Sequence, residues 1–265
     1  MSYDLVVFEK SKAPVEAAKF LAWYEKQTEW GGDYDYNDIS HASPDLQKFF
    51  HKIRTSFPPM NGAFAPSNEE LSGRPDLEER LCDYCIGEDM IYLSLAYSVA
   101  DRAYELVKRA AYFTGVGFYD PSDGSAVPNF FESRYPMLLE GEGFQPVEVS
   151  DFDSISEKLD KMTVKNRSYL YLTDQIGSYI QVGGYGDSFT VEKHVYVDCL
   201  FYTYQKAEYR IASQTNEKGS VMIAGNQVKV KRQQILSGET VRQLFYDFFQ
   251  MTKTMDSVEW VDMQC

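Results

Sequence analysis

The sequence predicts an α+β protein with two units, each with its own sheet and helices. The chain has 265 residues, of which 44% are hydrophobic and 15% aromatic, enough apolar material for one large core or two ordinary ones. Segments with helical spacing of apolar residues alternate with short apolar runs that are typical of strands. Residues 121–143 are irregular and rich in glycine and proline, so we expect units at 1–143 and 144–265.

The first unit is expected to begin with a strand and two helices. Residues 2–9 hold a run of apolar residues that indicates a buried strand. A helix is expected over residues 14–28, because proline is favoured in the first helical turn. Ser43 is expected to cap a second helix that begins at Pro44, since the apolar residues after it have i, i+3, i+4, i+7 spacing. Residues 58–80 contain four prolines and are expected to form a long loop.

The rest of the first unit is expected to add three strands and one helix. Strands are expected over 82–87 and 90–97, then a helix capped by Ser98 and ended by Gly115, then a strand over 116–119. The order strand, helices, strand, strand, helix, strand predicts a ferredoxin-like βαββαβ arrangement, with an extra helix and loop in the first crossover.

The second unit is expected to be an antiparallel sheet with helices packed on one face. A short helix should follow a cap at Asp153 or Ser154, a last helix should open near Gly238, and residues 258–262 could form an edge strand. Turn-forming residues separate the other apolar segments. The strands expected between the two helices are 168–173, 179–182, 189–197, 201–213 and 219–230.

Charge and composition exclude several classes of ligand. The net charge is −14; residues 1–143 hold 13 Lys and Arg against 24 Asp and Glu, a net −11, which leaves −3 for residues 144–265. Such an excess disfavours nucleic acid and anionic membranes, and it favours rapid capture of a cationic protein. No apolar run approaches the ~20 residues of a membrane span. The N-terminus has no signal-peptide pattern, and four cysteines are too few for a disulfide scaffold, so we expect a cytoplasmic protein.

Three motifs resemble sites of known chemistry but lack essential parts. Cys82-Asp-Tyr-Cys85 lies in an expected strand, where the two thiols face opposite sides, and no second pair is spaced for zinc. The segment from Asp33 to Asn37 resembles the start of a calcium loop, but the sixth and twelfth positions are wrong. The glycines of 183–187 join two strands, as in a hairpin, rather than feeding a helix.

Nothing else in the sequence indicates catalysis. The three histidines, His41, His51 and His194, have no nucleophile near them in sequence, and the carboxylates are too numerous for one acid–base pair to stand out. We therefore expect a non-enzymatic protein with no cofactor and no metal.

The candidate site is the segment Glu29–Asp38, which holds four carboxylates, three large aromatic residues and no cation. Aromatic residues supply contact area and carboxylates steer a basic partner, so this composition suits a surface that binds a cationic protein. An ordinary polar loop with locally packed aromatics is the alternative. A second acidic region, residues 69–89, either extends this surface or is a solvated loop. The expected partner-binding residues are Glu29, Trp30, Asp33, Tyr34, Asp35, Tyr36 and Asp38.

Several segments are similar to a known class of protein. In the C-terminal half these are the strand, glycine turn and strand of residues 178–192, the helix 238–254 and the closing Glu259-Trp260. They resemble the small immunity proteins that bacteria encode beside polymorphic toxins. The N-terminal half resembles Gram-positive bacterial proteins that open with a similar strand, here Tyr3–Phe8, followed by helix residues 20–24 and strand residues 84–87. The resemblance assigns no role to individual residues.

The resemblance implies a non-enzymatic protein that binds one toxin and blocks its active site or its assembly. Many such toxins are basic nucleases, which would suit an acidic inhibitor. The leading hypothesis is therefore an immunity protein that neutralises a cognate basic toxin. Two alternatives stay open: an enzyme or small-ligand-binding protein with a site between the two halves, and a homodimeric scaffold that uses exposed sheet edges.

Overall fold

The computed structural model describes residues 2–163, 167–210 and 217–263. Contacts divide the chain into two compact units, Met1–Glu132 with Asp198–Leu200, and Ser133–Val197 with Phe201–Cys265. Helices and antiparallel sheets occur in both units, which confirms the α+β class. In the described ranges, no helix has both the length and the apolar character that crossing a membrane requires.

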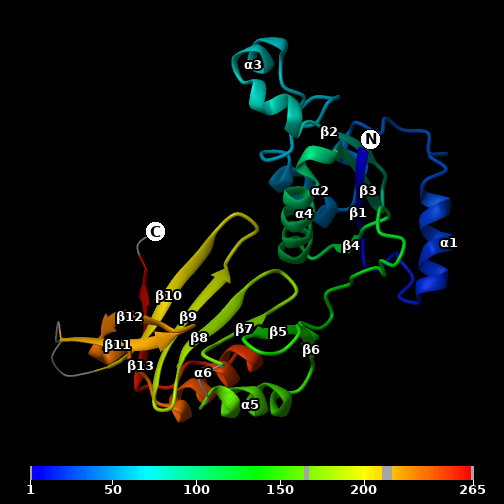
Figure 1. Ribbon diagram of the computed structural model, residues 1–265. Coiled ribbons are helices and arrows are strands. Elements are labelled where there is room, and N and C mark those ends of the chain that lie inside the picture. The colour runs from blue at the N-terminus through cyan, green and yellow to red at the C-terminus, as the bar shows by residue number, and fades with distance from the viewer. Residues whose placement is uncertain (1, 164–166, 211–216, 264–265) are drawn as a thin grey trace. The chain divides into compact units, whose positions relative to one another are not determined.

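The first unit is built on a four-stranded sheet with the order β2-β3-β1-β4, in which every neighbouring pair is antiparallel. Helices α2 and α4 lie on one face of this sheet and α1 lies on the other (Figure 1). The elements are β1 (Ser2–Phe8), α1 (Ala17–Gln27), η1 (Ile39–His41), α2 (Pro44–Ile53), α3 (Asn68–Gly73), η2 (Pro75–Arg80), β2 (Cys82–Ile86), β3 (Met90–Ala96), η3 (Tyr97–Val99), α4 (Ala100–Thr114) and β4 (Gly117–Tyr119).

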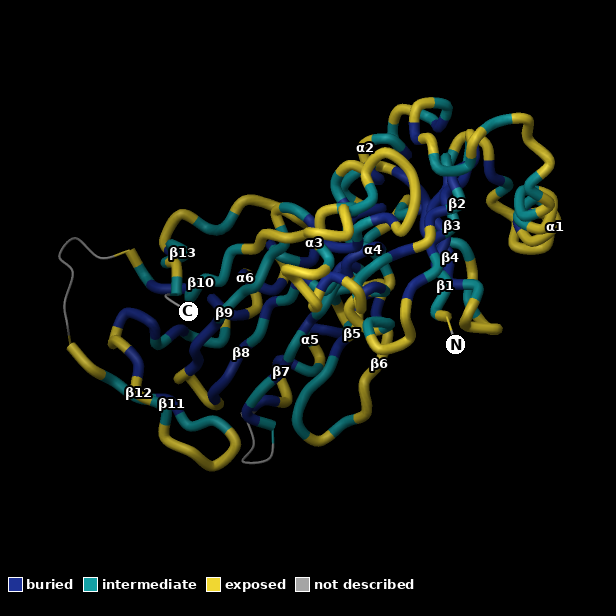
Figure 2. The backbone as a smooth tube through the Cα atoms, turned by 90° about the horizontal axis from the view of Figure 1, so that it is seen from above, coloured by how far each residue is buried: buried dark blue, intermediate teal, exposed yellow. Residues whose placement is uncertain are grey.

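Helices on both faces explain the unbroken apolar run in β1. Alternate side chains of a strand point to opposite faces, so Leu5 and Val7 join the core beneath α2 and α4. Val6 and Phe8 join a second core beneath α1, where the rings of Phe8 and Phe20 lie 4.9 Å apart between centroids. In Figure 2 most of β1 is coloured as buried, whereas much of α1 is exposed.

Two helix termini that the sequence marks by local signals lie at the expected residues. The Ser43 hydroxyl accepts a hydrogen bond of 3.4 Å from the amide of Leu46, and Pro44 is the first residue of α2. Gly115 ends α4 in the left-handed conformation, with φ of +82°, which glycine adopts without a side-chain clash.

Three expectations for the first unit are wrong. The loop expected over 58–80 contains α3 and η2; Ser67 and Glu70 form a capping box that starts α3. Ser98 does not cap α4, because the chain first forms η3, and α4 follows without a side-chain cap at Val99. Helix α1 begins at Ala17, three residues later than Pro14.

The second unit has a seven-stranded sheet with the order β13-β10-β9-β8-β7-β5-β6 and a separate hairpin, β11-β12. Helices α5 and α6 pack on one face of the large sheet (Figure 1). The elements are β5 (Met137–Gly141), β6 (Val147–Val149), α5 (Phe152–Asp160), η4 (Lys161–Thr163), β7 (Tyr169–Thr173), β8 (Tyr179–Tyr185), β9 (Ser188–Tyr196), β10 (Tyr202–Tyr209), β11 (Lys218–Ile223), β12 (Asn226–Lys231), η5 (Arg232–Gln234), α6 (Gly238–Gln250) and β13 (Val258–Asp262).

The second unit also differs from expectation in places. Strand β5 lies inside the stretch 121–143 that was expected to be irregular, and it pairs with β7, so the expected boundary at residue 143 falls after a strand of this unit. Residues 219–230 are two strands joined at Ala224-Gly225, and Asp151 rather than Asp153 or Ser154 caps α5. The edge strand β13 is confirmed. Residues 211–213 of the strand expected over 201–213 lie outside the described residues.

Candidate partner-binding site

The segment Glu29–Asp38 turns its first aromatic residue onto the sheet. Helix α1 ends beside Thr28, whose hydroxyl donates to the Glu25 carbonyl at 2.9 Å. Trp30 follows with a positive φ of +49°, a strained conformation for a bulky residue. Its ring packs edge-to-face against Tyr36 and against Tyr92 of β3, at centroid distances of 5.3 and 6.2 Å. The strained turn therefore serves to place the indole over the sheet.

The two tyrosines of the segment pack locally. The Tyr34 ring lies 4.1 Å from the ring of His41, and the Tyr36 hydroxyl accepts a 2.7 Å hydrogen bond from the Gly32 amide. The Tyr36 carbonyl accepts a 2.9 Å hydrogen bond from the amide of Ile86, which ties the loop to β2. Tyr34 and Tyr36 are therefore half-buried parts of a folded loop.

The four carboxylates of the segment are exposed, and two of them have local structural roles. Asp35 accepts hydrogen bonds from the amide and side chain of Asn37, at 2.9 and 3.0 Å. Asp38 caps η1 by accepting from Ser40, and these hydrogen bonds hold the pKa of Asp38 below its ordinary value. Glu29 and Asp33 are exposed to solvent. The segment thus combines packed rings with an acidic exterior.

Next to this segment lies a hollow of about 470 Å³ on the sheet face that α1 covers only in part. Trp30 is the one expected site residue that lines it. Aromatic side chains come from α1, from the loop and from β3, and carboxylates come from β1 and β2. None of the described residues that line the hollow is Lys or Arg; they are Ser2, Asp4, Tyr24, Thr28, Trp30, Asp83, Cys85, Tyr92 and Ser94.

The strand register explains why these side chains meet. Ser94 of β3 pairs with Asp4 of β1 on one side and with Asp83 of β2 on the other, so the three form one row across the sheet. Tyr92 lies in the next row, between Val6 and Cys85. Side chains two residues apart on a strand share a face, so both rows point toward α1.

The hollow has a negative electrostatic character. Burial, together with the nearby carboxyl group of Asp4 and the phenol of Tyr24, raises the pKa of Tyr92 above its ordinary value. Burial and the charge of Asp83 raise the pKa of the Cys85 thiol to about 11. In both cases burial is the largest cause, and the neighbouring carboxylate further disfavours a negative charge at the hollow.

One carboxyl oxygen in the hollow lacks a partner. Asp4 Oδ1 is buried and has no hydrogen bond within the described part of the chain. Asp83 is exposed and has a weak contact of 3.4 Å from the side-chain amide of Asn61. The exposed Asp83 carboxylate therefore has acceptor capacity for a ligand, and the charge of Asp4 lies beside it in the same row.

In the second acidic region, residues 69–89, some carboxylates have local structural roles and one lines the hollow. Glu70 completes the cap of α3, and Asp76 forms ion pairs with Arg74 and Arg80 at 3.2 and 2.5 Å. Asp83 is the one carboxylate of this region that lines the hollow. Charge counting alone misses this distinction, because the register of β2 decides which carboxylate joins the site.

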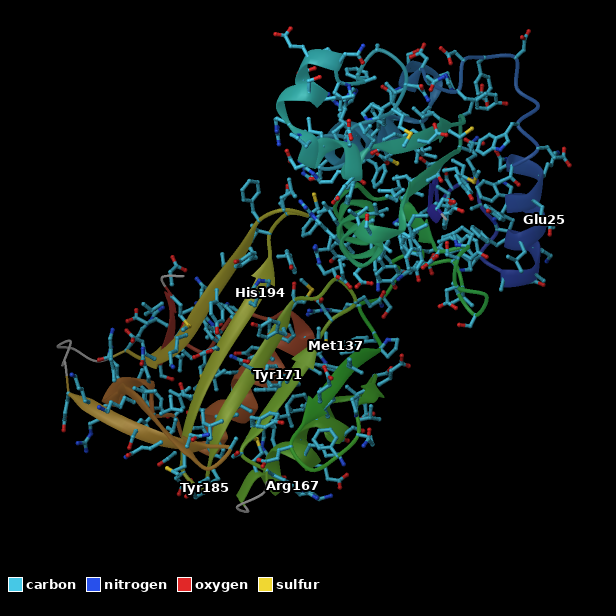
Figure 3. The ribbon with its side chains drawn as sticks, turned by 45° about the horizontal axis from the view of Figure 1, so that its top comes forward. Glu25, Met137, Arg167, Tyr171, Tyr185 and His194 are labelled. Carbon is cyan, nitrogen blue, oxygen red and sulfur yellow. The ribbon has the colours of Figure 1, made fainter. Side chains whose placement is uncertain are left out.

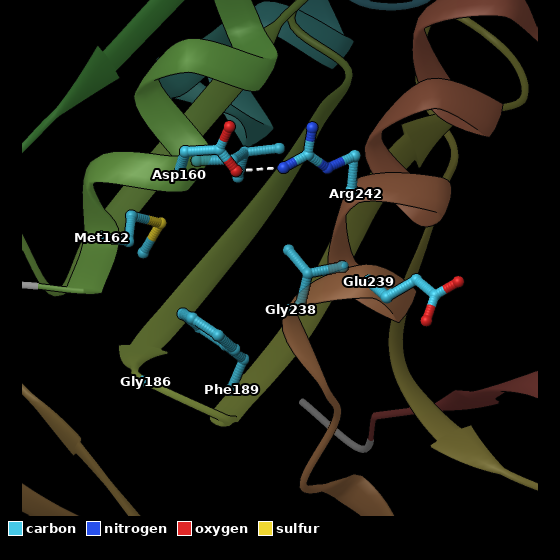
Figure 4. A pocket seen from close by; sticks show the side chains of 9 residues that line it. Asp160, Met162, Gly186, Phe189, Gly238, Glu239 and Arg242 are labelled. Atoms are coloured by element: carbon cyan, nitrogen blue, oxygen red, sulfur yellow. Dashed lines mark hydrogen bonds and ion pairs between the residues drawn. The ribbon is translucent and has the colours of Figure 1, made fainter.

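A hollow of the second unit offers a contrast (Figure 4). It holds about 290 Å³ between the end of α5 and the start of α6, with Phe189 and Met162 among its apolar walls. Asp160 and Arg242 form an ion pair across it, and Arg242 also donates to the Ser156 hydroxyl at 2.6 Å. Because Arg242 and Asp160 neutralise each other, this hollow is a weaker candidate.

The sheet face of the second unit that is turned away from α5 and α6 carries aromatic residues and a charged network. Figure 3 labels Tyr171 and His194 on this sheet. Glu192 accepts hydrogen bonds from Gln181 and Tyr204 at 2.6 and 2.7 Å and pairs with Lys206 at 2.9 Å. The polar groups of this network find their partners within the sheet, which indicates a structural role.

The motifs set aside on sequence grounds occupy structural positions. Cys82 is buried beneath the sheet and Cys85 faces the hollow, so the two thiols are on opposite faces. In the described ranges, no group of three or more His, Cys, Asp and Glu side chains is arranged to hold a metal ion. The glycines of 183–187 form the β8–β9 hairpin, as expected.

Sequence comparison assigns no family to this fold and hollow. Neither the protein-family models nor the curated proteins include a match to the chain.

Proposed function

We propose that the chain is a non-enzymatic binding protein that takes a basic protein partner on the acidic face of its first unit. The observation that supports this most is the hollow, where Asp4 and Asp83 flank aromatic walls and no described lining residue is a cation. The exposed carboxylates of Glu29 and Asp33 lie in the adjoining loop. Aromatic contact area with surrounding charge is the composition that binding surfaces favour.

The resemblance to immunity proteins supports a particular partner, a cognate basic toxin that is neutralised by occlusion. In this proposal the carboxylates steer the toxin and pair with its Lys and Arg residues, while Trp30 is buried by the contact. Such a protein would work in the cytoplasm of the bacterium that makes the toxin. We further infer that the first unit has the ferredoxin-like fold, which its sheet order supports.

Affinity capture from cells of the source organism tests the proposal. The bait is the full chain, compared with Asp83→Asn and with Asp45→Asn as a matched control. Asp45 is on α2, beneath the other face of the sheet, and pairs with Lys48 at 2.7 Å. We expect one basic protein to be retained by the natural chain and by the control, and largely lost with Asp83→Asn.

Three results would contradict the proposal: retention of no basic protein, equal retention by all three baits, or activity of the captured toxin that persists in the complex. Light scattering on the free chain gives a further check, because a stable dimer formed through this same face would support the scaffold alternative.

A further inference from the structure

We propose that the hollow of the first unit is a socket for one arginine side chain, which enters with its guanidinium between Asp4 and Asp83. This inference depends on the proposed function, since the arginine belongs to the basic partner. The overall charge indicates only a basic partner, whereas this inference names the side chain that is recognised.

The spacing of the carboxylates favours a broad, planar cation. Asp4 and Asp83 are separated by the intervening strand β3, so their backbones lie two strand spacings apart, roughly 10 Å. A metal ion requires its ligand oxygens within about 2.6 Å of one centre. A guanidinium has donors on several edges and reaches both sides of the row, whereas a lysine ammonium is a point charge that would favour one carboxylate.

The walls of the hollow also suit a guanidinium. Trp30, Tyr24 and Tyr92 line it from three different elements. Guanidinium groups stack on aromatic rings, and tryptophan is the strongest partner in cation–π contacts. The edge-to-face packing of the Trp30 ring on Tyr92 holds this wall in position without a ligand.

An independent observation indicates a missing donor. Asp4 Oδ1 is buried without a hydrogen-bond partner among the described residues, and the neutral phenol of Tyr92 beside the same carboxyl group leaves its charge uncompensated. Ser94, the residue between the two aspartates in the row, is neutral and cannot compensate either charge. A guanidinium would supply both the donor and the compensating charge.

The test uses three capped tripeptides, Gly-Arg-Gly, Gly-Lys-Gly and Gly-citrulline-Gly, titrated into the ¹⁵N-labelled full chain. Citrulline has nearly the shape of arginine without its charge. We expect the arginine peptide to shift the indole N–H signal of Trp30 in a saturable way, while the signals of Trp23 and Trp260 stay unchanged. The lysine peptide should bind about tenfold more weakly and the citrulline peptide should not bind.

Variants locate the effect. Asp83 is exposed, so Asp83→Asn should fold, and it should weaken arginine binding about tenfold, whereas Asp45→Asn should leave it unchanged. Equal binding of lysine or citrulline, or unchanged binding by Asp83→Asn, would overturn the socket. If a basic partner is captured but the arginine peptide does not bind, the socket fails and the proposed function stands. If the peptide binds but no basic partner is found, the proposed function fails.

Discussion

Replacing Trp30 by alanine and by glycine provides the sharpest check on how the wall of the hollow is built. The indole is half-buried against Tyr36 and Tyr92. Truncating a fully buried tryptophan to alanine costs about 3–5 kcal/mol, so half burial suggests about 2 kcal/mol for Trp30→Ala. Trp30→Gly loses the same ring, but glycine relieves the backbone strain at φ +49°. We therefore expect the glycine variant to be more stable than the alanine variant by about 0.5–1 kcal/mol.

The assay is hydrogen exchange of backbone amides in β1 and β3, which reports the unfolding free energy of the first unit separately from the second. Amides of β8 and β9 serve as the internal control, because neither variant touches that unit. The usual order, in which alanine is more stable than glycine, would refute a strained turn at residue 30. A loss well below 1 kcal/mol for both variants would show that the indole does not pack on Tyr92.

Two further predictions concern groups with unusual surroundings. The Cys85 thiol has a pKa raised from 9.0 to about 11. Its contribution to stability is therefore fully present below pH 9 and is lost as the pH rises through 11. Alkylation of Cys85 in the native protein should be slow at pH 9, and Asp83→Asn should make it faster. The side chains of Glu192 and Lys206 form an ion pair and are both less than one-fifth exposed. Glu192→Ala leaves Lys206 without this partner and should lower the free energy of unfolding, measured with urea, by about 2–3 kcal/mol. The exposed Glu148 on edge strand β6 provides the control, since Glu148→Ala should cost less than about 0.5 kcal/mol; an equal loss would contradict the reading of the network.

The sequence predicts elements well where the signal is local. Ser43 with Pro44, and Gly115, mark helix ends through contacts within a few residues, and the structure confirms them. The capping box of Ser67 and Glu70 is an equally local signal that the prolines around it obscured. Strand β5 could not be found in this way, because it is defined by pairing with β7, about thirty residues further along the chain.

The residues of the site likewise divide into those that local sequence predicts and those that strand pairing brings together. The composition of its segment predicts Trp30 as a contact residue, and in the structure Trp30 lines a hollow. Asp4 and Asp83 are far apart in sequence, and only the register through Ser94 brings them into one row. The sequence of β1 gives only a partial signal, since Asp4 is a charged residue directly before the buried residues Leu5–Phe8. It does not identify the second carboxylate, which comes from β2.

The central claim is that a basic partner binds at the hollow of the first unit, and its association rate tests this most directly. The captured partner is mixed with the natural chain by stopped flow at increasing salt, with tryptophan fluorescence as the signal. The association rate should fall at least tenfold between low salt and physiological salt, and Asp83→Asn should reduce both the rate and its dependence on salt. A rate that does not change with salt, or one that is identical for the natural chain and Asp83→Asn, would contradict the account.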